Sequence, residues 1–184
     1  MLKKLISSLK DCRVIKLGNY SYFVHPLSNG IPSIEPALLE ELVEEVAEKS
    51  KMNFNKIVTV EAMGIPFATA LSQKTGLPQT IIRKRQLGLP EEISVQQVTG
   101  YSESKLFING IEKGDSIMFV DDVLSTGSTL RASLKAIGMI GAKVPEVWII
   151  FNRGDEAPKI EKEFGVEIHS LLNVRVVEDR VLVQ

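Results

Sequence analysis

The residues best suited to chemistry lie in segment 117–129, which reads Ile-Met-Phe-Val-Asp-Asp-Val-Leu-Ser-Thr-Gly-Ser-Thr. Four apolar residues end in two adjacent carboxylates, Asp121 and Asp122, and a loop rich in hydroxyl groups follows. Apolar residues then recur at helical spacing, so the segment predicts a buried strand, a tight loop and a helix. Such a loop directs backbone N–H groups and the positive end of a helix dipole at one point, which suits a phosphate.

The side chains of this loop support the same prediction. Asp121 and Asp122 would repel a phosphate, so we expect them to accept hydrogen bonds from sugar hydroxyls or to hold a hydrated cation through water. We assign no direct metal ligand. Hydroxyl donors for the phosphate, and one glycine that lets the backbone approach it, are Ser125, Thr126, Gly127, Ser128 and Thr129. Acceptors for a sugar beside donors for a phosphate predict a site for a phosphorylated pentose.

An acidic pair by itself has a simpler interpretation, as a cap or a solvated loop. The crowding of polar residues at the carboxyl end of a buried strand favours a ligand site, because open α/β sheets bind ligands there. Neither a Walker loop nor a dinucleotide fingerprint is present.

The composition is that of a globular domain and argues against several classes of protein. The chain has 184 residues, of which 44% are hydrophobic and 24% charged, and its net charge of −1 favours no nucleic-acid partner. The single Cys12 excludes an internal disulfide and a cysteine-rich zinc site. No apolar run reaches the ~18 residues of a membrane span, and the first residues are too broken in pattern for a signal peptide. We therefore expect a cytoplasmic protein.

A second strand-to-helix turn could bind further phosphates of the same ligand. Its alternative is an ordinary connection between elements. The turn consists of Glu61, Ala62, Met63 and Gly64.

Basic and polar residues follow the next expected strand. Arg83 and Lys84 could neutralise phosphate charge, although a basic cluster is also typical of a solvated surface. Segment 84–105 is then either a flexible lid or a surface hairpin.

Three residues are candidates for contact with a base. Phe151 could stack on it and Arg153 could donate to a carbonyl oxygen, with edge packing and a surface charge as the alternative. Asn29 is the third candidate. We assign structural roles to His25 and His169.

Strands alternate with helices along the chain, which predicts an α/β fold with a central, mostly parallel sheet flanked by helices. We expect a single domain, 1–184, in which residues 1–35 form a small hood on the base side and 93–98 pairs with 105–108 as a projecting hairpin. The hood would contain a helix in 2–9, a hairpin of 14–17 and 20–24 turning at 18–19, and a loop at 25–35. The other strands are expected at 56–60, 79–83, 117–120, 144–151, 167–172 and 181–183, and the other helices start near 36, 64, 130 and 158.

These motifs resemble the type I phosphoribosyltransferase family. Segment 120–129 looks like the family's motif for phosphoribosyl pyrophosphate, although Ser128 stands where the family usually has a second glycine. Segment 61–66 looks like its pyrophosphate loop and 84–105 like its flexible lid. More narrowly, segments 23–32, 61–66, 98–102 and 109–115 are similar to the archaeal hypoxanthine/guanine phosphoribosyltransferases.

The resemblance implies transfer of a phosphoribosyl group to hypoxanthine or guanine, with release of pyrophosphate. It implies magnesium carried mainly by the substrate's pyrophosphate, a homodimer, and no membrane or nucleic-acid partner. Asp121 and Asp122 would be catalytic, 125–129 would bind the 5′-phosphate, and 61–64 with Arg83 and Lys84 would bind pyrophosphate.

Two alternatives remain open. An adenine phosphoribosyltransferase would share the same build, but an Arg or Lys aimed at O6 favours the oxo base. A non-catalytic regulator that senses phosphoribosyl pyrophosphate would be expected to carry a DNA-binding element, and the amino-terminal segment shows no helix-turn-helix pattern.

Overall fold

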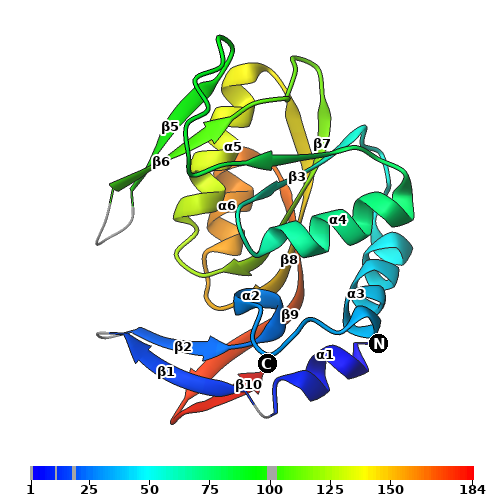
Figure 1. The fold of residues 1–184 in the computed structure, drawn as a ribbon, viewed down its shortest axis with the longest axis vertical. Coiled ribbons are helices and arrows are strands. Elements are labelled where there is room, and N and C mark those ends of the chain that lie inside the picture. Colours follow the sequence, from blue (N-terminus) through cyan, green and yellow to red (C-terminus); the bar gives the residue numbers. More distant parts are fainter. Residues whose placement is uncertain (1, 11, 18–19, 99–102) are drawn as a thin grey trace.

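A computed structural model describes residues 2–10, 12–17, 20–98 and 103–184. A six-stranded sheet forms its centre (Figure 1). The strands are β3 (Lys56–Val60), β4 (Gln79–Ile82), β7 (Ser116–Leu124), β8 (Lys143–Asn152), β9 (Glu167–Val177) and β10 (Arg180–Val183), in the spatial order β10-β9-β8-β7-β3-β4. All neighbouring pairs are parallel except β9 and β10. The prediction of a mostly parallel α/β sheet is confirmed.

Helices cover both faces of this sheet (Figure 1). Side chains alternate between the faces along each strand, so Ile57 and Met118 enter one core and Val58 and Phe119 the other. The first core packs on α3 (Pro36–Lys49) and α4 (Gly64–Thr75), and the second on α5 (Ser128–Ile140) and α6 (Ala157–Phe164). No helix in the described ranges is long and apolar enough to cross a membrane.

A hood of small elements lies at one end of the sheet (Figure 1). It contains α1 (Lys3–Ser8), an antiparallel hairpin of β1 (Arg13–Leu17) and β2 (Tyr20–Val24), and α2 (Pro26–Asn29). The predicted loop at 25–35 therefore contains a short helix. The β9–β10 hairpin packs against β1 and β2, so the hood includes the carboxyl-terminal segment as well as residues 1–35. The predicted turn at 18–19 lies outside the described residues.

A second hairpin, β5 (Ile93–Val98) and β6 (Glu103–Ile108), projects from the opposite end (Figure 1). It rests on α5, and Leu106 and Ile108 are buried in the second core. The hairpin predicted from sequence therefore has an apolar inner face that anchors it. Residues 99–102 of the predicted lid lie outside the described part of the chain.

Two strands extend further than predicted. β7 continues to Leu124 and pairs with β8 through Asp121 and Ile149, so the acidic pair lies inside the strand and not after it. β9 continues past the predicted end at 172, and a turn with positive φ at Glu178 and Asp179 leads into β10.

His25 connects the two hood helices. Its ring is fully buried; Nε2 lies 2.8 Å from Ser8 Oγ, and Nδ1 accepts from Leu27 N at 3.1 Å. Burial lowers the pKa of His25 from 6.5 to about 4. Below pH 6.5 the unfolded chain therefore binds this proton more readily than the folded chain. The stability that a neutral His25 contributes is complete above that pH and is lost as pH falls toward 4.

We expect His25→Asn to weaken this pH dependence. Asparagine retains an acceptor for the Leu27 N–H at the helix N-cap but does not titrate. Between pH 6.5 and pH 4 the wild type should lose roughly 2–3 kcal/mol more unfolding free energy than the variant. Urea titrations at the two pH values measure the difference. Equal losses in both proteins would show that His25 does not link folding to pH.

Candidate active site

The acidic pair lies near the carboxyl end of β7, in the interior of the sheet. Asp122 N donates to Asp121 Oδ1 at 3.0 Å. Burial raises the pKa of both carboxyls, and the charge of Asp122 raises the pKa of Asp121 further, while Lys84 acts in the opposite direction on both. Hydroxyl donors or positive charge on a ligand would favour full ionisation of this pair. The pair is thus suited to bind adjacent hydroxyls or to balance a cation.

The turn 61–64 lies directly against this pair. A Cβ atom on Gly64 would lie 2.1 Å from Thr59 Oγ1 and 2.9 Å from Asp121 Oδ1, so only glycine fits. The hood meets the same turn, because a Cβ on Gly30 would lie 4.0 Å from Met63 Cε. The structure therefore brings together the acidic pair, the predicted pyrophosphate turn and the end of α2.

Glu61 orients the basic residues that follow β4. Its Oε1 accepts from Lys84 N at 2.5 Å, and its Oε2 lies 3.8 Å from Arg83 Nε. The backbone of Arg83 is held in turn by Phe107, which it contacts through two hydrogen bonds of 2.9 and 2.7 Å. The sequence suggested that Glu61 contacts an anion. In the structure its carboxylate accepts the backbone N–H of Lys84 and lies near the guanidinium of Arg83 beside the turn.

Gly127 opens α5 with a φ of +73°. A Cβ there would lie 2.7 Å from both Arg131 Nη1 and Ile160 Cδ1. The sequence suggested that glycine was needed to leave space for a phosphate. The structure gives a different reason, since this loop packs directly against α5 and α6.

The remaining loop residues line the turn between β7 and α5. Thr126 Oγ1 donates to Ser128 Oγ at 3.2 Å, and Thr126 is exposed while Ser125 and Ser128 are half-buried. Thr129, in the first turn of α5, accepts a hydrogen bond from Gln97 of β5. The pattern of residues in the sequence gives no signal for Gln97.

Phe151 differs from its predicted role. Its side chain is fully buried, and its ring meets Phe23 and His25 edge-on at centroid distances of 5.3 and 5.0 Å. A ring enclosed in this way packs against the hood and leaves no face free to stack on a base.

Arg153, just after β8, is held by the hood. Its Nη2 donates to Ser21 O at 2.7 Å, and its Cζ lies 5.3 Å from the centroid of the Phe23 ring. Asn29 ends α2, where its Oδ1 accepts from His25 N at 3.2 Å and from Ser28 Oγ at 2.8 Å.

Potential metal ligands gather elsewhere. Among the described residues, Glu146, Glu167 and His169 place ligand atoms within 4.8 Å of one another. This group lies toward the starts of β8 and β9, at the edge of the sheet away from the acidic pair. Lys51 pairs with Glu167, and Trp148 Nε1 donates to Glu146 at 3.0 Å, so both carboxylates already have protein partners.

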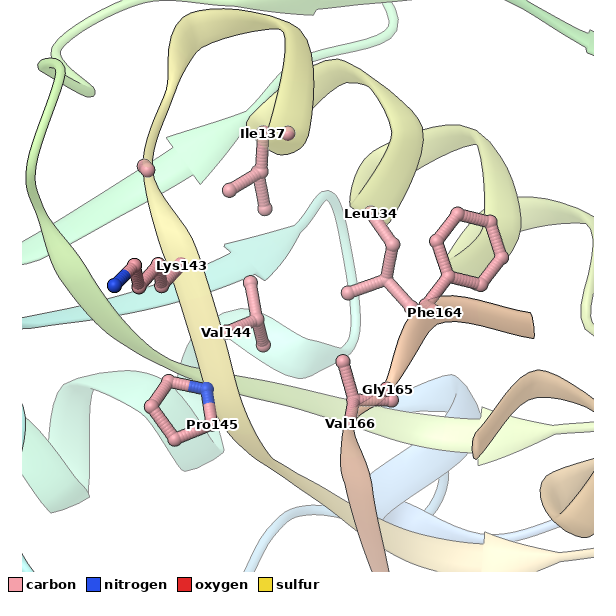
Figure 2. Close-up of a pocket in the computed structure, with 10 residues that line it drawn as sticks. Leu134, Ile137, Lys143, Val144, Pro145, Phe164, Gly165 and Val166 are labelled. Carbon is pink, nitrogen blue, oxygen red and sulfur yellow. The ribbon is translucent and has the colours of Figure 1, made fainter. Parts of the chain in front are cut away.

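Two cavities also lie away from the acidic pair. One, of about 350 Å³, is open to solvent and is lined by apolar side chains such as Leu134, Val144 and Phe164 at the start of β8 (Figure 2). The other, of about 890 Å³, lies between α1 and residues 31–38. Neither is lined by the two strand-to-helix turns.

Comparison with known proteins gives consistent matches. The model of the phosphoribosyl transferase domain matches residues 33–177. The hypoxanthine/guanine phosphoribosyltransferase of Methanohalobium evestigatum is 50% identical over 184 residues, which cover 100% of this chain and 96% of that protein. The protein of the same name from Methanosarcina mazei is 49% identical over 181 residues, with 98% and 95% covered.

Solved structures with the same fold include adenine phosphoribosyltransferases. The enzyme from Thermoanaerobacter pseudethanolicus superposes with a TM-score of 0.78 at 22% identity, covering 94% of this chain and 99% of that one. The enzyme from Giardia lamblia, complexed with 9-deazaadenine, gives 0.73 at 19% identity, covering 94% and 97%. At such identities the likeness shows the fold.

We expect Gly64→Ala to destabilise the protein and disturb the acidic pair. The added methyl would overlap Thr59 Oγ1 and Asp121 Oδ1 and force the turn outward, at a cost of roughly 1–3 kcal/mol. Gly138→Ala in α5 is the matched control. Apart from its chain neighbours and the backbone of its own helix, no atom of the described residues lies within 4 Å of its new Cβ, and alanine should stabilise the helix by about 0.5–1 kcal/mol. Denaturant unfolding of both variants measures the changes. Equal stability of the two variants would contradict the close approach at Gly64.

Proposed function

The chain belongs to the phosphoribosyl transferase domain family, and from that membership we propose that it is a purine salvage enzyme. It joins hypoxanthine or guanine to phosphoribosyl pyrophosphate and forms IMP or GMP and pyrophosphate. The observation that carries the proposal is the meeting of two strand-to-helix turns at one half-buried acidic pair. The base class follows the names of relatives that are 45–50% identical over nearly their whole length.

The turn 125–129 holds the 5′-phosphate of the sugar. The first turn of α5 offers backbone N–H groups that have no partner within the helix, and the helix dipole favours an anion there. The hydroxyl groups of Ser125, Ser128 and Thr129 supplement these donors. Binding energy from this end of the substrate orients the reacting carbon at the other.

The acidic pair acts on the ribose. Asp121 and Asp122 accept hydrogen bonds from its two ring hydroxyls, which favours their ionised form. During transfer the bond between the anomeric carbon and pyrophosphate breaks, and the sugar ring gains positive character. A nitrogen of the base forms the new bond and releases its proton, which the departing pyrophosphate or water takes up. Two fixed carboxylates next to that ring stabilise the developing charge.

The leaving pyrophosphate is held by the turn 61–64 together with Arg83 and Lys84. Glu61 keeps the chain at Arg83 and Lys84 beside the turn, through the backbone N–H of Lys84 and the guanidinium of Arg83. Magnesium, when bound by the pyrophosphate, neutralises charge on the leaving group. The site fits such an ion, because Asp121 and Asp122 offer the oxygen acceptors that a hydrated magnesium prefers.

The base lies between the hood and the end of β8. Arg153 donates to O6 of a 6-oxopurine, and Ser21 and Phe23 hold its guanidinium in place. Asn29 contributes from the end of α2.

Segment 84–105 acts as a lid that excludes water from the reacting sugar, and the hairpin β5–β6 anchors it to the rest of the protein.

We further propose a homodimer that works in the cytoplasm, which size-exclusion chromatography and cell fractionation can test.

An assay of purine and pyrimidine bases with phosphoribosyl pyrophosphate and magnesium tests the proposal. We expect turnover with hypoxanthine and guanine. Turnover with adenine instead would favour the adenine enzyme, whose fold the chain shares. Binding of phosphoribosyl pyrophosphate without turnover of any base would favour a regulator.

We expect Arg153 to set the base preference. A buried donor facing the amino group of adenine would lack a partner, at a cost of ~1–3 kcal/mol, which corresponds to about tenfold to hundredfold in kcat/KM. Arg153→Ala should reduce the preference for hypoxanthine over adenine by that factor. Competition assays on both proteins measure it. An unchanged preference would place base selection elsewhere, most simply in the backbone around Asn29.

We expect Asp122→Asn to reduce kcat/KM strongly while the fold survives. The loss of one charged acceptor beside the sugar should cost roughly 2–4 kcal/mol of transition-state stabilisation. Steady-state kinetics, with circular dichroism as the control for folding, tests this. Near-normal kcat/KM would remove Asp122 from the mechanism.

A further inference from the structure

Gln97 of β5 connects the hairpin to the turn between β7 and α5. Its side chain is 7% exposed, and its Nε2 donates to Thr129 Oγ1 at 2.6 Å. Ser104, on the paired strand β6, donates through its Oγ to Gln97 Oε1 at 3.1 Å. That second bond fixes which end of the amide faces Thr129. A chain of hydrogen bonds therefore runs from β6 through β5 to the first turn of α5.

This arrangement determines what the Thr129 hydroxyl can do. A threonine hydroxyl has one proton to donate and two lone pairs that accept. Because Thr129 Oγ1 accepts from Gln97, its own proton is available for a different acceptor. An anion at the amino end of α5 is such an acceptor.

Position 97 lies on the apolar inner face of β5, where a buried amide is unexpected. Along β5, Ile93 and Val95 pack against the second core, and an apolar residue at 97 would continue that face. A buried amide is tolerated only where its hydrogen bonds are made, as they are here on both sides. These hydrogen bonds form only when the hairpin lies at one position on α5, so they fix where it packs.

We propose that Gln97 is a positioning residue for the phosphate end of the site. Its bond to Thr129 commits the hydroxyl proton to the bound phosphate and ties phosphate affinity to the seating of the β5–β6 hairpin. The inference rests on the proposed function, which places the phosphate at 125–129. Coupling of this kind is reciprocal, so a bound phosphate also stabilises the seated hairpin.

Calorimetric titration with ribose 5-phosphate tests the inference directly. Gln97→Met keeps the length of the side chain but cannot donate, and should weaken binding about fivefold to tenfold, the scale of one hydrogen bond. Gln96→Met is the matched control, because Gln96 precedes it on the same strand with an exposed side chain, and it should bind as the wild type does.

A double-mutant cycle shows whether Gln97 acts through Thr129. Thr129→Val should weaken binding by itself, and adding Gln97→Met to it should cause no further loss. Losses that simply multiply would overturn the proposal. So would normal binding by Gln97→Met beside weak binding by Thr129→Val.

Two further measurements separate positioning from a structural role. Gln97→Met should raise KM for phosphoribosyl pyrophosphate more than KM for hypoxanthine. In hydrogen exchange, ribose 5-phosphate should slow exchange in β6 of the wild type but not of the variant. Equal protection of β6 in both proteins would contradict the coupling. Wild-type binding of ribose 5-phosphate by Thr129→Val would overturn the inference alone, because backbone N–H groups and two further hydroxyls also hold the proposed phosphate. Failure of the wild type to bind ribose 5-phosphate would contradict the proposed phosphate site itself, and binding without turnover of any base would contradict only the proposed reaction.

Discussion

The site depends on how closely the first turn of α4 approaches β7. β3 and β7 are neighbouring parallel strands, so the turns that follow them compete for the same space above the sheet edge. The absence of a side chain at Gly64 resolves this competition, because any Cβ would overlap Thr59 and Asp121. Thr59 Oγ1 is buried there without a hydrogen-bond partner among the described residues. A buried hydroxyl without a partner lowers the stability of the fold by about 1–3 kcal/mol. This hydroxyl lies beside the same glycine as Asp121, and such unfavourable groups are expected at functional sites.

The same close approach organises the charges. Partial burial raises the pKa of both adjacent carboxyls and so opposes their full ionisation, and the charge of Lys84 offsets part of this effect. Glu61 in turn holds Arg83 and Lys84 beside the turn. In the proposed reaction, negative charge thus lies next to the sugar that becomes positive, and positive charge lies next to the anion that leaves. The chain carries a net charge of only −1, so this separation is local and cannot be read from its composition.

The sequence predicted what depends on local pattern. Alternating strands and helices, and the hydroxyl-rich turn after β7, followed from periodicity and residue type. The β9–β10 turn was missed because Glu178 and Asp179 take positive φ without the Gly or Asn that usually signals such a turn. Phe151 was assigned to the base because a strand end places it near the ligand edge, but packing by Phe23 and His25 encloses it. Gln97 gave no signal, because its partner is distant in sequence and one buried amide does not alter a strand pattern.

The base contact that we propose for Arg153 depends on the hood, which makes base choice the least predictable property of the site. Arg153 reaches its position through Ser21 O and the Phe23 ring, both on β2. β2 in turn packs against β9, and an ion pair of 3.9 Å joins Lys16 to Asp179 beyond it. The orientation of one guanidinium therefore depends on segments from both ends of the chain. The phosphate turns, by contrast, are each built within one strand-loop-helix unit. Motifs of contiguous residues therefore predict the sugar-phosphate half of the ligand, whereas the base half depends on long-range packing that no short motif contains.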